Sequence, residues 1–495
     1  MKIMKYLSFA LLLTTALVIQ GCSDDDNGST PATTLSVTRD GVEISEISCS
    51  MGAMTTMLAI NTDGTWTASM PDADTTWLSI TPHEGYGWEV NDTSATNTSS
   101  YMKVTVARNS GDARTSTISI VAGNFSKQIT ISQNGRTNGE DDPIETVWDM
   151  IENFTLGYNL GNTLDSNPTG DWWDPTGKTA TDYETSWGQP VTTQAIIDAI
   201  YDKGFKLFRV PVTWEQHMDE NNQVDEAWMN RVEEVVNYVL SHDDAYCIIN
   251  VMHDTGDGGW LYADADAYPT LTVKFQDLWN QIATRFRDYD GHLIFESFNE
   301  ILNASYSWTV PSAGDGAYDA INNLQQDFVD VVRATGGNNE YRNLAVTTYA
   351  ATSSQVPIDE FVLPTDVHDN HIYASIHSYD PYNFCNDNSG TNSDGSEYDW
   401  NIYVFDSSCT SEIDDVFSRL NTRFNNVGIP YILGEFGAID ENKDMSERVS
   451  YATYVAQKLK ASGTTGLWWM GLYNRSTDTW YEEQIVNALF TAFGD

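Results

Sequence analysis

Two glutamates in this chain, Glu300 and Glu435, follow short and mostly apolar runs of sequence. Residues 293–298 lead into Asn299 and Glu300, and residues 429–433 are followed, after one glycine, by Glu435. Apolar runs of this length are typical of buried parallel strands whose last residues emerge into a site. A single strand-terminal glutamate is most often a solvated loop residue. Two of them indicate a carboxylate pair, which could serve proton transfer and nucleophilic attack.

The elements that must position these glutamates alternate along residues 144–495. Amphipathic segments of helical periodicity separate the apolar runs, namely residues 228–240, 273–286, 320–332 and 448–459. The runs themselves lie at residues 156–160, 207–211, 248–253, 293–298, 344–347, 372–377, 429–433 and 466–469. Eight alternating β/α units predict an α/β fold, a (β/α)8 TIM barrel with enlarged loops. A doubly wound sheet is the alternative, but no glycine-rich phosphate-binding turn follows the first run.

A parallel barrel brings the carboxyl ends of all its strands to one face, where the active sites of such barrels lie. Residues at these ends should therefore cluster, although they are far apart in the sequence. Besides the two glutamates, the expected strand ends supply polar and aromatic residues suited to a polar substrate, namely Asn162, Arg209, His253, Asn299, His377, Tyr379 and Trp469.

Residues 34–135 differ from the rest of the chain and predict a small, immunoglobulin-like β-sandwich. They are rich in Thr, Ser and Val, alternate in polarity, and are punctuated by Gly, Asn and Asp, which indicates about seven short strands. The segments 77–82 and 129–135 resemble the BACON domain. That resemblance implies carbohydrate binding through Trp66, Trp77 or Trp88, or a spacer role, which we favour. Residues 136–143 are polar and acidic and form the expected linker.

The first residues of the chain have the pattern of a targeting segment. Lys2 and Lys5 precede an apolar stretch, residues 6–19, that is too short to span a bilayer comfortably. Residues 1–21 resemble a bacterial lipoprotein signal peptide, with Cys22 as the lipidated residue. The acidic residues that follow, within a tether at 22–33, resemble the surface-export signal of Bacteroidetes lipoproteins. A cell-surface protein with an outer-membrane lipid anchor is expected.

The composition narrows the choice of partner. The chain carries 25 basic and 71 acidic residues, a formal net charge of −46, which would repel the phosphate backbone of nucleic acids. Neutral or cationic ligands remain compatible with this charge. The 16 Trp and 25 Tyr suit either sugar stacking or an ordinary aromatic core. We expect a monomer that requires no cofactor or metal.

Four cysteines remain when Cys22 is set aside, and none of their spacings matches a zinc site. Export permits disulfides. Cys385 and Cys409 flank one polar loop and are the expected pair. Cys247 lies inside an apolar run and is expected to be a buried free thiol.

The combined motifs of the second part resemble glycoside hydrolase family 5. Arg209 stands in Phe-Arg-Val-Pro-Val, His253 in Met-His-Asp, Glu300 in Phe-Asn-Glu, and Glu435 in Gly-Glu-Phe-Gly, while residues 377–379 give His-x-Tyr. Residues 158–165 and 184–190 are similar to subfamily 4 of that family. The resemblance implies an endo-acting β-1,4-glucanase. One departure is the sequence Trp-Trp-Met-Gly at 468–471, where that subfamily usually has Trp-Asp-Asn-Gly. The resemblance therefore leaves the loop contacts and the choice of substrate open.

The resemblance also implies the role of each residue. Glu435 is the nucleophile, kept ionised by Arg209 and Tyr379, and Glu300 is the acid and then the base. Neighbouring negative charge is expected to raise the pKa of Glu300. Asn299 is expected to bind the sugar 2-hydroxyl, His253 and His377 to bind hydroxyls or orient the glutamates, and Trp469 to stack on the sugar. The alternatives are a β-mannanase or xylanase of the same clan and an inactive glycan-binding protein.

Overall fold

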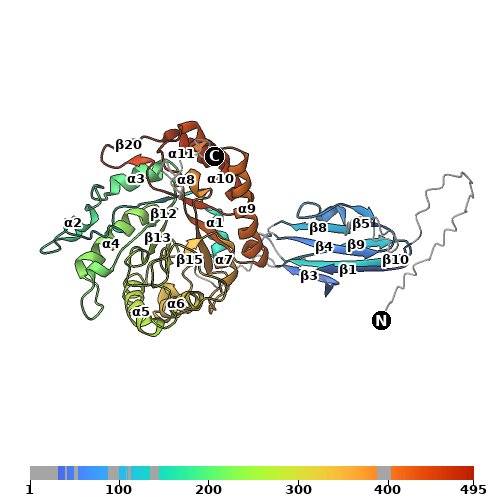
Figure 1. Ribbon diagram of the computed structural model, residues 1–495, viewed down its shortest axis with the longest axis horizontal. Helices are drawn as coiled ribbons and strands as arrows, with labels where there is room; N and C mark the ends of the chain where they lie inside the picture. Colours follow the sequence, from blue (N-terminus) through green and yellow to red (C-terminus); the bar gives the residue numbers. More distant parts are fainter. Residues whose placement is uncertain are drawn as a thin grey trace, which may run out of the picture.

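The computed structural model describes residues 32–39, 42–49, 54–86, 100–107, 109, 113–133, 144–386 and 403–494. They form a β-sandwich and a larger α/β barrel (Figure 1). The signal peptide, Cys22 and the linker at 136–143 lie outside these residues. None of the helices in the described ranges has the length and apolar character needed to cross a bilayer.

The sandwich has two five-stranded sheets, ordered β2-β1-β4-β8-β6 and β3-β10-β9-β5-β7. Its strands are β1 (Leu35–Arg39), β2 (Val42–Glu43), β3 (Glu46–Cys49), β4 (Met54–Thr62), β5 (Thr65–Ser69), β6 (Leu78–Thr81), β7 (Glu84–Tyr86), β8 (Ser100–Val106), β9 (Arg114–Ala122) and β10 (Phe125–Gln133). Both sheets contribute to one apolar core, so the predicted all-β domain is confirmed. The expected number of strands was too low because β2, β3 and β7 are too short to show alternation.

Two of the three tryptophans considered as sugar platforms belong to this core. Trp66 is 1% exposed and its indole N–H donates to Ser100, and Trp77 is 8% exposed. A buried ring cannot stack on a sugar. Trp88 lies outside the described residues.

The second part is a closed barrel of eight parallel strands in sequential order, and the predicted TIM barrel is confirmed. The strands are β11 (Gly157–Asn159), β12 (Leu207–Val210), β13 (Tyr246–Asn250), β14 (Leu293–Glu296), β15 (Leu344–Thr352), β16 (Ile372–Ser378), β17 (Tyr431–Phe436) and β18 (Gly466–Trp469). Each corresponds to one predicted run. The fourth strand ends two residues earlier than expected, so that Glu296 is its last residue.

Helices surround the barrel (Figure 1). They are α1 (Val147–Glu152), α2 (Ala180–Glu184), α3 (Gln194–Asp202), α4 (Glu226–Leu240), α5 (Tyr268–Arg285), α6 (Gly316–Ala334), α7 (Gln355–Glu360), α8 (Tyr382–Cys385), α9 (Ser407–Arg423), α10 (Met445–Ala461) and α11 (Glu483–Phe493). The four helical segments expected from the sequence correspond to α4, α5, α6 and α10. Apolar residues of α1 pack against the first residues of several strands, which closes the amino-terminal end of the barrel.

A buried arginine, Arg342, fixes the connection between α5 and β14, the strand that carries the first glutamate. Its guanidinium donates to the backbone carbonyls of Phe286, Tyr289, Asp290 and Leu293. The carbonyls at the carboxyl end of a helix lack partners within the helix and carry partial negative charge. The cation therefore caps α5 and anchors the start of β14, although burial lowers its pKa to about 9.

The expected disulfide is absent, and that prediction is wrong for this structure. Cys385 and Cys409 are both buried free thiols, and the Cys409 sulfur instead donates to the carbonyl of Val404 at 3.7 Å. Cys385 is the last residue of α8, and Cys409 lies in the first turn of α9. Proximity in the sequence does not by itself bring the two sulfur atoms into bonding position. Cys247 is a buried free thiol, as predicted. The side chain of Cys49 is not described.

A buried histidine makes the stability of the barrel dependent on pH. The His217 ring stacks on Trp228, with ring centroids 3.6 Å apart, and meets the edge of Tyr183. Burial lowers the pKa of His217 to about 3. The folded protein therefore binds this proton less well than the unfolded chain, so its contribution to stability is complete above pH 6.5 and is lost as the pH falls toward 3.

We expect the His217→Phe variant, which keeps the ring stacking, to be less sensitive to acid than the wild type. Between pH 7.5 and 4.5 the wild type should lose about 2–3 kcal/mol more unfolding free energy than the variant, because two pH units below 6.5 correspond to about 2.7 kcal/mol. Urea unfolding at the two pH values measures this difference. Equal losses in both proteins would contradict the prediction.

Candidate active site

A cleft of about 920 Å³ opens at the carboxyl ends of the barrel strands. Seven of the nine residues selected from the sequence line it, namely His253, Asn299, Glu300, His377, Tyr379, Glu435 and Trp469. Arg209 lies directly beneath them and has no exposed surface. The structure thus brings together residues from six strands, as the barrel prediction required.

Glu435 lies on β17 and is held by two donors. Arg209 donates from Nη1 to Glu435 Oε1 at 2.8 Å, and the Tyr379 hydroxyl donates to Oε2, also at 2.8 Å. The residue is 4% exposed. Both expected supports of this carboxylate are therefore present, one for each oxygen.

A β-bulge at Gly434 aims Glu435 into the cleft. On the neighbouring strand β16, Ile376 pairs with Leu433 but His377 pairs with Glu435, so Gly434 is an extra residue in β17. A Cβ atom at Gly434 would lie 2.4 Å from the Ser375 hydroxyl. Glycine is thus required where the strand bends, and the bulge changes the direction of the next side chain.

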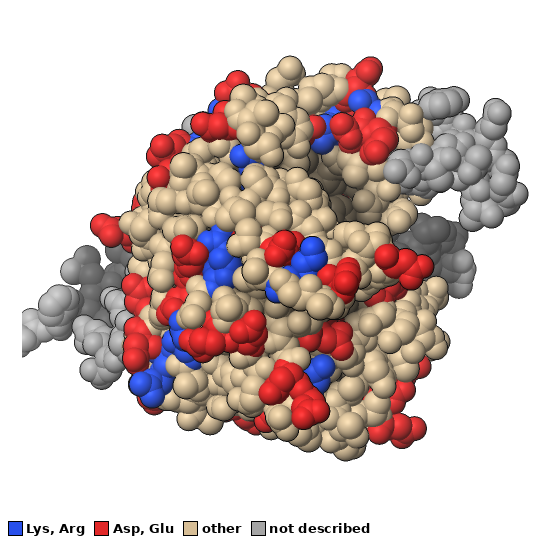
Figure 2. Space-filling model, turned by 90° about the vertical axis from the view of Figure 1, so that its left-hand side faces the viewer, with Lys and Arg blue, Asp and Glu red and all other residues tan. Residues whose placement is uncertain are grey.

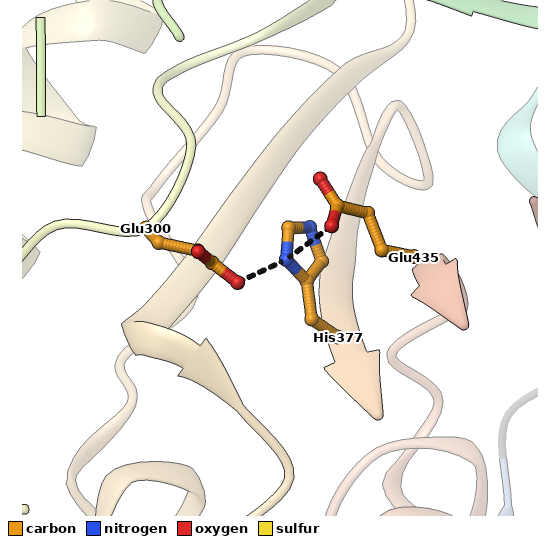
Figure 3. A group of neighbouring side chains, drawn as sticks. All are labelled: Glu300, His377 and Glu435. Carbon is orange, nitrogen blue, oxygen red and sulfur yellow. Dashed lines mark hydrogen bonds and ion pairs between the residues drawn. The ribbon is translucent and has the colours of Figure 1, made fainter. Parts of the chain in front are cut away.

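Glu300 follows β14 and is paired with a histidine. His377 Nδ1 lies 2.8 Å from Glu300 Oε1 and 3.6 Å from Glu435 Oε2, so the imidazole stands between the two carboxylates (Figure 3). One ligand-type atom from each of the three residues lies within 4.8 Å of the others. The two carboxyl groups are therefore close enough to act on the same bond.

The charged groups of this cluster shift one another's pKa values. Burial raises the pKa of Glu435, and the positive charges of His377 and Arg209 oppose that rise. Burial lowers the pKa of His377, but the negative charges of Glu435 and Glu300 have the larger effect, so the pKa of His377 is raised above its ordinary value. Glu435 is more deeply buried than Glu300, whose side chain contacts the His377 imidazole.

Asn299 is oriented by the same arginine. Arg209 Nη2 donates to Asn299 Oδ1 at 2.9 Å, which leaves the amide NH2 as the donor on the cleft side. An amide so placed suits a hydrogen bond to a sugar hydroxyl, as the resemblance implied.

The asparagine that contacts Arg209 at the end of the first strand is Asn159, and the structure does not bring Asn162 to this cluster. Asn162 adopts a left-handed conformation with φ of 59°, its backbone N–H donates to Asp165, and it does not line the cleft. Asn159 is the fully buried residue that accepts from Arg209 at 3.1 Å and donates to the carbonyl of Gly434. The missed signal was a polar side chain inside the apolar run at 156–160.

His253 lines the cleft without touching either glutamate among the contacts of the described residues. Its Nε2 lies 3.8 Å from Asp165, and its ring centroid lies 5.2 Å from that of Trp187. His253 was expected either to bind sugar hydroxyl groups or to orient the glutamates, and its position favours the first of these roles. The neighbouring residue, Asp254, joins the loops after β12 and β13 by accepting from the backbone N–H groups of Trp214 and Glu215 and from the Trp260 indole.

Trp469 forms one wall of the cleft beside Met470, which is where the sequence departs from the subfamily pattern. A Cβ atom at Gly161 would lie 3.0 Å from the Trp469 ring and 3.1 Å from the Met470 sulfur. The glycine therefore lets both side chains pack directly against the backbone of the loop after β11.

Glu300, His377 and Glu435 are also spaced so that they could hold a metal ion. Both oxygens of Glu435 already accept hydrogen bonds, one of them from the Arg209 cation. The positive charge of Arg209, next to Glu435 Oε1, would repel a metal ion bound to the same carboxylate. The contacts favour a pair of catalytic carboxyls.

A (β/α)8 barrel with two close carboxyls, a guanidinium and an aromatic wall at its carboxyl-terminal face defines a barrel glycoside hydrolase. A family model described as cellulase (glycosyl hydrolase family 5) matches residues 173–474. The chain belongs to glycoside hydrolase family 5. A second model, BACON, described as a putative N-terminal binding domain, matches residues 65–134.

Curated relatives agree with this family. Endoglucanase A of Clostridium longisporum is 37% identical over 361 residues, which cover 70% of this chain and 65% of that protein. The cellulase/esterase CelE of Acetivibrio thermocellus is 39% identical over 368 residues, 70% of this chain and 40% of that protein. The chain thus matches less than two thirds of the length of these two relatives. For endoglucanase A of Ruminococcus albus, 32% identical, the match covers 92% of the relative.

Solved structures show the same similarity. A family 5 enzyme from Prevotella bryantii, a mutant in complex with a xyloglucan tetradecasaccharide, is 39% identical, with a TM-score of 0.63 over 71% of this chain and 99% of that chain. A lichenase from Caldicellulosiruptor sp. F32, a mutant in complex with cellotetraose, is 35% identical, with a TM-score of 0.64 over 71% of this chain and 96% of that chain.

Proposed function

We propose that this chain is a retaining endo-β-1,4-glucanase that cleaves cellulose-type, mixed-linkage or xyloglucan chains. The separation of the two carboxyls carries the proposal. Retaining glycosidases place their carboxyl groups about 5–5.5 Å apart, and inverting ones about 6.5–9.5 Å apart. Oxygens of Glu300 and Glu435 lie within 4.8 Å of one another, which leaves no room for a water between a base and the sugar.

The first step forms a covalent intermediate. The Glu435 carboxylate attacks the anomeric carbon, while Glu300 gives its proton to the glycosidic oxygen. The bond between carbon and that oxygen breaks, and an ester to Glu435 forms. Arg209 and Tyr379 hold the attacking carboxylate, and the Asn299 amide grips the 2-hydroxyl.

The second step releases the sugar with its original configuration. Glu300 takes a proton from water, whose oxygen bonds to the anomeric carbon and displaces Glu435. His377 contacts both carboxyls, so its imidazole stabilises whichever of them carries the charge at each stage. Two inversions at the same carbon give net retention.

A neutral polysaccharide suits the surface of the molecule. The net charge is −46, and Figure 2 shows one face that is hollowed and carries acidic side chains with basic ones mixed among them. Polyanions such as nucleic acids would be repelled. The similar structures solved with xyloglucan and with cellotetraose support a β-glucan substrate.

The substrate is tested by release of reducing sugar from carboxymethylcellulose, barley glucan, xyloglucan, xylan and mannan. We expect turnover on one or more of the three glucans, with a rapid fall in polymer viscosity because internal bonds are cut. Turnover on mannan or xylan alone would favour the alternative specificities. Glycan binding without turnover on the whole panel would favour an inactive binding protein.

We further propose that the protein acts as a monomer on the cell surface, anchored through lipidated Cys22, with the β-sandwich as a spacer. The two lysines, the apolar stretch and the acidic residues after Cys22 support export and lipidation. The burial of Trp66 and Trp77 supports the spacer role. In a Cys22→Ser variant the protein should no longer incorporate labelled palmitate or fractionate with outer membranes.

A further inference from the structure

A second buried carboxylate, Glu296, contacts the arginine that holds Glu435. Glu296 is the last residue of β14 and is 2% exposed. Its Oε2 accepts from Arg209 Nε at 2.6 Å and from Asn250 Nδ2 at 2.9 Å, and its Oε1 accepts from the Ser375 hydroxyl at 2.6 Å. Three donors surround it, so these contacts stabilise a negative charge below the floor of the cleft.

The guanidinium of Arg209 therefore forms ion pairs with two carboxylates. Its Nε meets Glu296 at 2.6 Å, and its Nη1 meets Glu435 at 2.8 Å. The guanidinium also donates to the side-chain oxygens of Asn159 and Asn299 and to the Met252 sulfur. Burial opposes the charge of Arg209, but Glu296 and then Glu435 raise its pKa above the ordinary value. A single positive charge is thus shared by two buried negative ones.

We propose that Glu296 is a positioning residue that acts through Arg209 to set both the orientation and the charge balance of Glu435. This inference rests on the proposed role of Glu435 as the nucleophile. By taking the Nε–H, Glu296 fixes the plane of the guanidinium, so that Nη1 points at Glu435 and Nη2 at Asn299. Because Glu296 shares the positive charge of Arg209, the guanidinium binds the Glu435 carboxylate less strongly. Glu435 must loosen this contact when it attacks the sugar.

The charges that face Glu435 give the expected direction. Arg209 from β12, His377 from β16, Tyr379 just after β16 and Glu300 after β14 all act on it. If Glu296 loses its charge, the positive charge of Arg209 is no longer shared and interacts more strongly with Glu435. The repulsion between the negative charges of Glu296 and Glu435 also disappears. Both changes lower the pKa of Glu435 and make its carboxylate a weaker nucleophile.

Glu296→Gln isolates this charge, because glutamine can keep the same contacts. Its amide oxygen can accept from Arg209 and Asn250, and its NH2 can donate to Ser375 once that hydroxyl rotates. We expect kcat on soluble β-glucan to fall about tenfold or more and KM to change less than twofold. The acid limb of the pH–rate profile should move to lower pH by about one unit. Glu296→Asp, which keeps the charge, should leave that limb nearer its wild-type position.

Glu184→Gln is the matched control. Glu184 is also fully buried and paired with an arginine, Arg231, at 2.8 and 2.9 Å, but it does not line the cleft. This variant should lose thermal stability and keep the pH–rate profile of the wild type. A profile of folded Glu296→Gln that superimposes on the wild type, or an equal shift in Glu184→Gln, would overturn the inference.

A second measurement does not depend on activity. Carboxyl ¹³C spectra of protein labelled at glutamate, with the Glu435 signal assigned from a Glu435→Gln sample, give the titration midpoint of Glu435 directly. The midpoint should be lower in Glu296→Gln than in the wild type, and an unchanged midpoint would refute the charge balance. A wild-type protein without any glycosidase activity would overturn the proposed function instead, and the titration would still decide the role of Glu296.

Discussion

Replacing Glu435 with alanine is expected to reduce β-glucan hydrolysis on the order of 10⁵-fold, the loss typical of removing a catalytic nucleophile. Without this carboxylate no glycosyl ester can form, and neither Arg209 nor Tyr379 offers another nucleophile at that place. Reducing-sugar release by the wild type and by the purified, folded variant measures the effect.

Two further experiments separate loss of the nucleophile from loss of the fold. Glu441→Ala changes an exposed glutamate on the loop after β17 that does not line the cleft, and it should keep full activity. Azide, a small anion, should fit the space left in Glu435→Ala and restore turnover of an activated aryl glycoside, giving the α-glycosyl azide. Undiminished hydrolysis by Glu435→Ala would sink the assignment of this residue.

Replacing Glu300 with glutamine should reduce polysaccharide hydrolysis by about 10²- to 10⁴-fold, the usual contribution of a general acid–base group. The amide keeps the size of the side chain and its contact with His377 but cannot supply a proton to the glycosidic oxygen. A leaving group that needs no proton, such as dinitrophenolate, should therefore suffer a much smaller loss in the glycosylation step.

The pH–rate profile gives a separate test of the same residue. In the wild type the rate should fall on the alkaline side, where the donor has lost its proton, and on the acid side, where Glu435 becomes protonated. The alkaline limb should vanish or move in Glu300→Gln, while the acid limb remains because Glu435 is intact. A bell-shaped profile identical to that of the wild type would show that another group donates the proton.

Strand prediction succeeded in the barrel because strands buried on both faces are continuous apolar runs, which are visible in a local window. The same reason explains the error at the fourth strand. Residues 293–298 form one mostly apolar run, and Glu296 is the carboxylate inside it. Burying a carboxylate in such a run costs free energy unless the carboxylate is paired. The odd residue in the pattern was itself the signal. Short edge strands of the sandwich were missed because two to four residues show too little alternation.

Side-chain contacts between residues far apart in the sequence could not be predicted from the local sequence pattern. Arg209 meets Glu296, Glu435 and Asn299 only because the barrel closes, and the bulge at Gly434 turns Glu435 toward them. The disulfide expectation failed for a similar reason, since chain proximity does not set side-chain direction.

Strand-terminal motifs and apolar periodicity are local properties of the chain, so they were enough to predict the two-part organisation, the barrel, and Glu300 and Glu435 as a carboxylate pair. Only the folded barrel shows which asparagine contacts Arg209, which partner faces each glutamate, and how one buried positive charge is shared by Glu296 and Glu435. These depend on distances of a few ångströms between residues on different strands, and at that range small changes in position and burial change electrostatic energies severalfold.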